Sequence, residues 1–135
     1  MELYFILALI AMVGYGISAI IYKLASSSID PVSLTLVSGC FMTFTIFLFW
    51  VFYKGKYVTI RGFEYATIAG IVVGFTFIAF VSSIYLGKVS VVSTMRGLSF
   101  LVTTMIAFFF LAEKISFTQA LGIGFAAVAV VLIGL

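Results

Sequence analysis

Few residues in this chain could bind a ligand, and one arginine stands out among them. Arg96 follows a short turn at Gly87–Lys88 and lies inside an apolar stretch, where an ionisable side chain is costly and usually faces the interior or a cavity. A guanidinium group pairs well with carboxylate or phosphate, so Arg96 could bind an anionic group of a substrate. The alternative is that its side chain only reaches out to the polar edge of the stretch.

Hydroxyl groups lie on both sides of the same turn. Ser93 and Thr94 come just before Arg96, Tyr85 comes just before the turn, and Tyr15 lies in an apolar stretch near the start of the chain. With Arg96 these four could line a polar cavity, and they are the candidate substrate-binding residues. The alternative for each is structural, because helical Ser and Thr hydroxyls commonly bond their own backbone and a tyrosine hydroxyl commonly bonds a neighbouring helix. Further hydroxyls near the turn come from Ser82, Ser83 and Ser90.

Other chemistries lack the residues that they need. The 135 residues include no histidine, a single cysteine (Cys40) and four acidic residues, each near the end of an apolar stretch. An intrachain disulfide, a metal site and a catalytic triad are therefore not expected, and we predict no cofactor and no enzymatic activity. The seven Lys and Arg residues form no basic cluster, so nucleic-acid binding is not expected either.

The composition predicts an integral membrane protein. Only 8% of the residues are charged and 65% are hydrophobic, whereas a soluble domain has about a quarter charged residues. The lipid bilayer is then the main partner, and we expect a single multi-pass domain over residues 1–135 in the cell membrane.

The apolar stretches predict an all-α bundle of five transmembrane helices, at residues 3–22, 31–53, 63–86, 89–112 and 117–135. Each has about twenty residues, enough to cross a hydrocarbon core of roughly 30 Å. Asp30 and Pro31 are typical of a helix start, as N-cap and first helical residue. Ser116 and Gln119 form a capping box in the polar elbow between the last two helices.

Small residues recur at helical spacing in several of these helices. Such spacing usually marks close contact between membrane helices. The sets are Thr35–Gly39–Thr43, Gly70–Gly74, Ala120–Gly124–Val128, and Gly122 with Ala126. Gly14 and Gly16, near the middle of the first helix, permit either close packing or a local bend. A cluster of Trp50, Tyr53 and Tyr57 is expected to lie at a membrane interface.

The last third of the chain, Gly87–Leu135, resembles the EamA-like members of the drug/metabolite transporter superfamily. An apolar fourth helix ends in a small residue, Glu and Lys, and a short turn, a Gln and a Gly-rich fifth helix follow. The residues that carry this likeness are Leu111, Glu113, Lys114, Gln119 and Gly122, and Gly14 and Lys23 in the first helix add to it.

This resemblance implies half of a transporter. Ten-helix members of the family contain two five-helix units in opposite orientation. A single unit is therefore expected to pair with a second copy, in a parallel or an antiparallel arrangement, or with a paralogue. Two departures limit the likeness. Met12 and Tyr15 occupy the middle of the first helix, where the small multidrug resistance branch has its proton-coupling Glu. Phe100 stands where many EamA-type units have a proline, so the resemblance does not imply a kink there.

Three functions remain open from the sequence. The first is a dimeric alternating-access carrier of a small metabolite, the second a flippase-type subunit for a lipid-linked sugar, with a lipid headgroup as substrate, and the third a membrane scaffold without transport. The charge distribution favours a cytoplasmic N-terminus and an outside C-terminus, with four basic residues in the inside loops against two or three outside. So small a difference leaves insertion in both orientations open.

Overall fold

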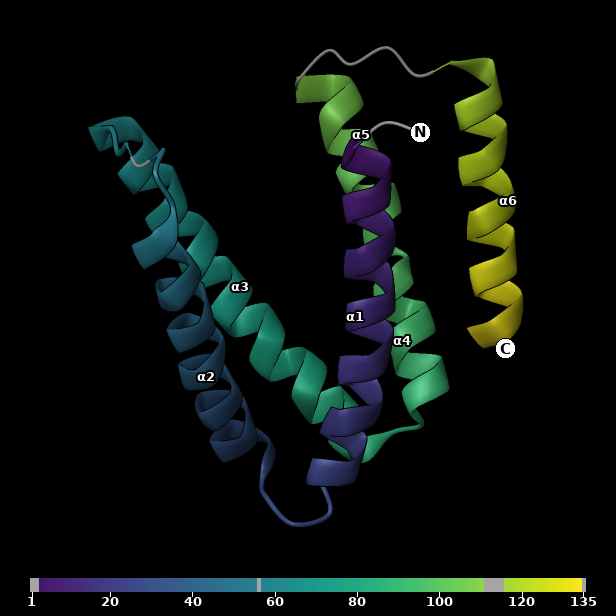
Figure 1. Ribbon diagram of the computed structural model, residues 1–135. Helices are drawn as coiled ribbons and strands as arrows, with labels where there is room; N and C mark the ends of the chain where they lie inside the picture. Colours follow the sequence, from purple (N-terminus) through teal and green to yellow (C-terminus); the bar gives the residue numbers. More distant parts are fainter. Residues whose placement is uncertain (1–2, 56, 111–115, 135) are drawn as a thin grey trace. The chain divides into compact units, whose positions relative to one another are not determined.

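Helices account for all the regular secondary structure in the described part of the chain. The computed structural model describes residues 3–55, 57–110 and 116–134, and no strand occurs among them. In chain order the helices are α1 (Leu3–Ala25), α2 (Pro31–Phe52), α3 (Ile60–Leu86), α4 (Val89–Gly97), α5 (Ser99–Phe110) and α6 (Phe117–Gly134) (Figure 1). The all-α prediction is confirmed. The six helices occupy the five expected stretches, since α4 and α5 both lie in the fourth.

Length and composition allow four of these stretches to cross a membrane. They are α1, α2, α3 and the fourth stretch, Val89–Phe110, which has 22 residues. The last helix, α6, has 18 residues and extends about 27 Å at 1.5 Å per residue, close to the thickness of a hydrocarbon core.

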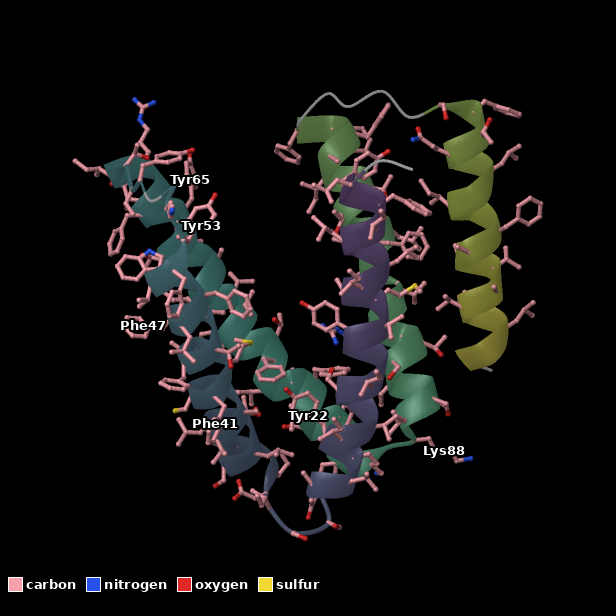
Figure 2. All side chains as sticks on the ribbon, viewed as in Figure 1. Tyr22, Phe41, Phe47, Tyr53, Tyr65 and Lys88 are labelled. Carbon is pink, nitrogen blue, oxygen red and sulfur yellow. The ribbon has the colours of Figure 1, made fainter. Side chains whose placement is uncertain are left out.

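The chain divides into two compact units. The first, Met1–Leu86, contains α1 to α3, and α3 packs there against both α1 and α2. The second, Gly87–Leu135, contains α4 to α6, and α4 packs there against both α5 and α6. In the first unit α2 lies along α3, and its Phe41 and Phe47 point away from α3 (Figure 2).

The start of α2 is capped as the sequence predicts. The Asp30 carboxylate accepts the backbone N–H of Val32 at 3.1 Å and that of Ser33 at 3.0 Å, and Pro31 follows as the first helical residue. These bonds satisfy donors that have no partner inside the helix. Hydrogen bonds from the Ser33 hydroxyl, the Ser33 N–H and the Val32 N–H hold the pKa of Asp30 below its ordinary value.

Two helices are longer than the sequence suggested. The first helix was expected to end near Tyr22, and it continues to Ala25, which takes Lys23 into its last turn. The third was expected to start near Phe63, and it begins at Ile60, where the Thr59 hydroxyl caps it by accepting the Gly62 N–H at 3.2 Å.

The small residues of α2 and α3 do share one surface, but they do not form a close contact. A groove of about 750 Å³ between the two helices is lined by Thr35, Gly39, Thr43, Gly70 and Gly74, among other residues. A Cβ atom built on any of these three glycines would meet no described atom within 4 Å. Within the described chain no helix crosses closely at Gly70–Gly74, and these residues line an open groove.

In α6 the small residues also lie on an exposed surface. Ala120, Gly124 and Val128 are exposed, as are Gly122 and Ala126. The less exposed positions of this helix are Ile123, Ala127 and Val130, which follow one another at helical spacing. Contact within the second unit therefore does not involve the predicted small-residue face of α6.

Candidate substrate-binding site

The fourth stretch is interrupted at Leu98, two residues after Arg96. The backbone N–H of Leu98 donates to the Met95 carbonyl at 3.0 Å, and the Leu101 N–H donates to the Leu98 carbonyl at 3.0 Å. Both bonds span three residues, as in a 3₁₀ turn, where an α-helix would span four. The stretch therefore has a 3₁₀-like turn at Leu98, whose backbone remains in the right-handed helical region, with nine residues in α4 before it and twelve in α5 after it.

The sequence predicted one helix over roughly residues 89–112, and the structure has helix over this stretch up to Phe110, with an irregularity at Leu98. Phe100 replaces the proline that would have signalled a kink, yet the chain breaks two residues earlier. Gly97 and Ser99 flank the break, and glycine with serine is a known cause of helix kinks, because glycine is a poor helix former and serine competes for backbone hydrogen bonds. These two residues were the available signal in the sequence.

Ser93 and Thr94 lie on α4 just before the break, and their hydroxyls differ in their surroundings. Thr94 Oγ1 donates to the Ser90 carbonyl at 2.6 Å, so this hydroxyl is satisfied by its own helix. Ser93 Oγ is buried and has no hydrogen-bond partner among the described residues. A buried hydroxyl without a partner is rare in folded proteins and calls for an explanation.

Arg96 occupies the last turn of α4 and its side chain is exposed. A cation there is favoured by the partial negative charge at the helix C-terminus. Since Ser93 and Arg96 are three residues apart on one helix, they lie on the same face. Arg96 and Ser93 therefore lie about 60° apart around the helix axis, whereas Thr94 lies about 100° from Ser93 and about 160° from Arg96.

The two candidate tyrosines belong to the first unit. Tyr15 lies in the middle of α1 and Tyr85 in the last turn of α3, and both side chains are exposed. Lys23 contacts the Tyr85 carbonyl. Tyr15 lies eight residues before Lys23, which is about 12 Å along the helix. Within this unit the structure does not place the two tyrosines side by side.

A lysine that sequence reasoning assigned to a loop makes the best-defined polar contact between two helices of the first unit. Lys23 Nζ donates to the Ile84 carbonyl at 2.8 Å and lies 3.4 Å from the Tyr85 carbonyl. The only signal in the sequence was that Lys23 directly follows an apolar stretch of helical length, where a long cationic side chain can reach a neighbouring helix end.

The elbow before α6 is confirmed where the structure describes it. The Ser116 N–H donates to Gln119 Oε1 at 2.9 Å, and the Gln119 N–H donates to Ser116 Oγ at 3.3 Å, which is the predicted capping box. The family-like residues Leu111, Glu113 and Lys114 lie outside the described residues.

No group of three His, Cys, Asp or Glu side chains in the described ranges could hold a metal ion. The candidate site therefore consists of a cation, a buried hydroxyl and a break in a membrane-spanning helix. Such a site can bind and orient a polar or anionic group.

The length and apolar composition of these helices indicate a multi-pass helical membrane protein. The sequence profile of the EamA-like transporter family matches residues 3–135, which is nearly the whole chain. The chain belongs to this family, as its last third suggested. Neither the curated proteins nor the solved structures contain a match to it.

Proposed function

We propose that the chain carries a small metabolite across the membrane and that an anionic group of this substrate binds at Arg96 and Ser93. The observation that supports this most is the break at Leu98, since transporters commonly bind substrates where a membrane helix is discontinuous. Arg96 would supply the charge, and the partnerless Ser93 hydroxyl would donate a hydrogen bond to the same group. Membership of a transporter family agrees with this role.

We also propose that two copies form the working carrier. The family profile covers residues 3–135, and the sequence predicts five membrane stretches there, whereas the resemblance implies that ten-helix members contain two such units in opposite orientation. A second copy, inserted antiparallel, would supply the missing half, and the two halves would expose the site alternately to each side. The small difference in charge between the two sides of the membrane is compatible with insertion both ways.

Uptake into liposomes tests the transport proposal. Purified protein in liposomes is offered a panel of labelled metabolites that includes matched pairs of anionic and neutral compounds, with protein-free liposomes as the control. Uptake of at least one anionic compound above the control is the expected result. A folded preparation that moves none of them would contradict the proposal, and movement of a lipid-linked sugar alone would favour a flippase.

The dimer is tested separately, by labelling. Single cysteines near each terminus, in a Cys40→Ser background, are probed with a membrane-impermeant thiol reagent. Reaction of each terminus from both sides of the membrane is expected for an antiparallel pair. Reaction of each terminus from one side only would exclude it.

A further inference from the structure

The helices of the first unit are held together at one end. Its buried side chains are Ala19, Ser26, Leu34, Val81 and Ile84. All five lie near the carboxyl ends of α1 and α3 or the start of α2. Every described residue of α1 before Ser18, and of α3 before Phe77, is exposed. Side-chain burial is thus confined to one end of the unit.

Figure 1 shows the same arrangement. Helices α1 and α3 run in the same direction, meet at their carboxyl ends and diverge toward their amino ends (Figure 1). The rings of Tyr22 (labelled in Figure 2) and Phe77 make an edge-to-face contact near the meeting point, with centroids 5.5 Å apart and planes at 73°. Such a pair adds about 0.5–1.5 kcal/mol to the burial of its rings.

Lys23 makes the polar connection at this end. Its amine donates to the Ile84 carbonyl at 2.8 Å and lies 3.4 Å from that of Tyr85. Both carbonyls belong to the last turn of α3, where no further N–H of the helix is available to them. A carbonyl without a partner is costly in a membrane, and a cation is favoured at a helix C-terminus, so this contact is stronger than one between surface side chains. The Ser26 hydroxyl, donating to the Lys23 carbonyl at 2.7 Å, steadies the same turn of α1.

We propose that Lys23 fixes the carboxyl end of α1 to that of α3, and that this end is the point about which the two helices open and close. Within the first unit, little side-chain burial opposes a change in the separation of the rest of α1 and α3. This goes beyond the transport proposal and does not require it, since the movement is a property of the unit without substrate.

The test measures the distance between the diverging halves of α1 and α3. Spin labels replace Ile10 and Ile71, which are exposed and each lie thirteen residues before the fixed end at Lys23 and Ile84. The lever is therefore about 20 Å long, and each ~10° of rotation moves a label by about 3.5 Å. The full chain is used in liposomes with Cys40→Ser, because Cys40 is exposed and would also react with the label.

Three variants are compared with the parent protein by pulsed electron resonance. Lys23→Met removes the donors at similar length, and it is expected to widen the distance distribution and shift its mean by several ångströms, as the lever predicts for rotations of about 10°. Lys23→Arg retains donors and charge, and is expected to restore the parent distribution. Lys88→Met removes an exposed lysine outside the unit and is expected to change nothing (Figure 2).

Two results would overturn the proposal. One is a Lys23→Met distribution that is the same as that of the parent. The other is loss of the helical circular dichroism signal in Lys23→Met, which would show that Lys23 maintains the fold of the unit and does not set the separation of its helices. Restoration by Lys23→Arg is the result that separates a specific contact from a general loss of stability.

Discussion

The buried hydroxyl of Ser93 leads to a prediction about stability that needs no knowledge of the substrate. Ser93 Oγ is buried without a partner among the described residues, so on folding it loses its hydrogen bonds to water and gains none. A buried group in this condition costs about 1–3 kcal/mol. Ser93→Ala removes this cost but leaves a void of ~20 Å³, which destabilises the folded state by roughly 0.5 kcal/mol at about 24 cal/mol per Å³. The variant should therefore be more stable by about 0.5–2.5 kcal/mol.

Thr94 offers a matched control one residue away. Its hydroxyl donates to the Ser90 carbonyl at 2.6 Å, so Thr94→Val, which keeps the shape, removes a satisfied hydrogen bond. This variant should lose about 0.5–1 kcal/mol, opposite in sign to Ser93→Ala. Unfolding of both variants in mixed micelles with increasing dodecyl sulfate measures the two free energies of unfolding.

In Ser93→Ala the affinity for the substrate should fall, although the stability of the protein rises. If Ser93 donates to the substrate, Ser93→Ala loses a hydrogen bond to a charged group, worth about 1.5–3 kcal/mol, and its affinity falls at least about tenfold while its stability rises. A Ser93→Ala protein that is destabilised to the same extent as Thr94→Val would refute the reasoning, because the hydroxyl would then have a partner in the folded state.

Three further predictions concern the helix ends, the break and the groove. Asp30→Asn keeps the cap but cannot titrate. Since the folded pKa of Asp30 lies below the ordinary 3.8, its contribution is present above that pH and lost as the pH falls through the folded value, so only the parent should lose stability in unfolding measurements below pH 4. Gly97→Ala should make the fourth stretch more continuous and stabilise the helix by about 0.5–1 kcal/mol. Amide exchange at Leu98 should slow and transport should fall. Unchanged exchange at Leu98 would contradict the role of Gly97 in weakening the helix there. Gly74→Ala should alter the free energy of unfolding by less than about 0.5 kcal/mol, because a Cβ there meets open space, and a loss above about 2 kcal/mol would show that the groove is filled.

Much of the fold follows from local rules that the sequence displays. Apolar length sets the five stretches, and the Asp30 and Ser116–Gln119 caps depend only on neighbouring residues, so both caps were predicted correctly. The helix boundaries at Ala25 and Ile60 were missed because each depends on a side chain that acts as a cap or reaches another helix. A residue sixty-one positions away accepts the hydrogen bond of Lys23, and no local pattern reports such a contact.

The candidate site was predictable only in part. Arg96 was found because a charge in an apolar stretch is conspicuous, and Ser93 because it lies close to Arg96 in sequence. That Ser93 lacks a partner while Thr94 has one depends on rotamers and on burial, which the spacing of residues does not determine. The spaced small residues of α2 and α3 did not determine whether another helix packs on them. The same spacing permits close packing and, where no helix packs, leaves an open surface.

Uptake by Arg96 variants tests the central claim most directly. In liposomes that carry a substrate found with the metabolite panel, Arg96→Gln should raise the Km by about 10- to 100-fold, as expected for the loss of a charge-assisted contact worth 1.5–3 kcal/mol, and Arg96→Lys should recover part of it. Lys88→Gln, which removes an exposed lysine near the start of α4, should leave uptake unchanged. An Arg96→Gln protein that transports the anionic substrate with the Km of the parent would contradict the proposed binding site.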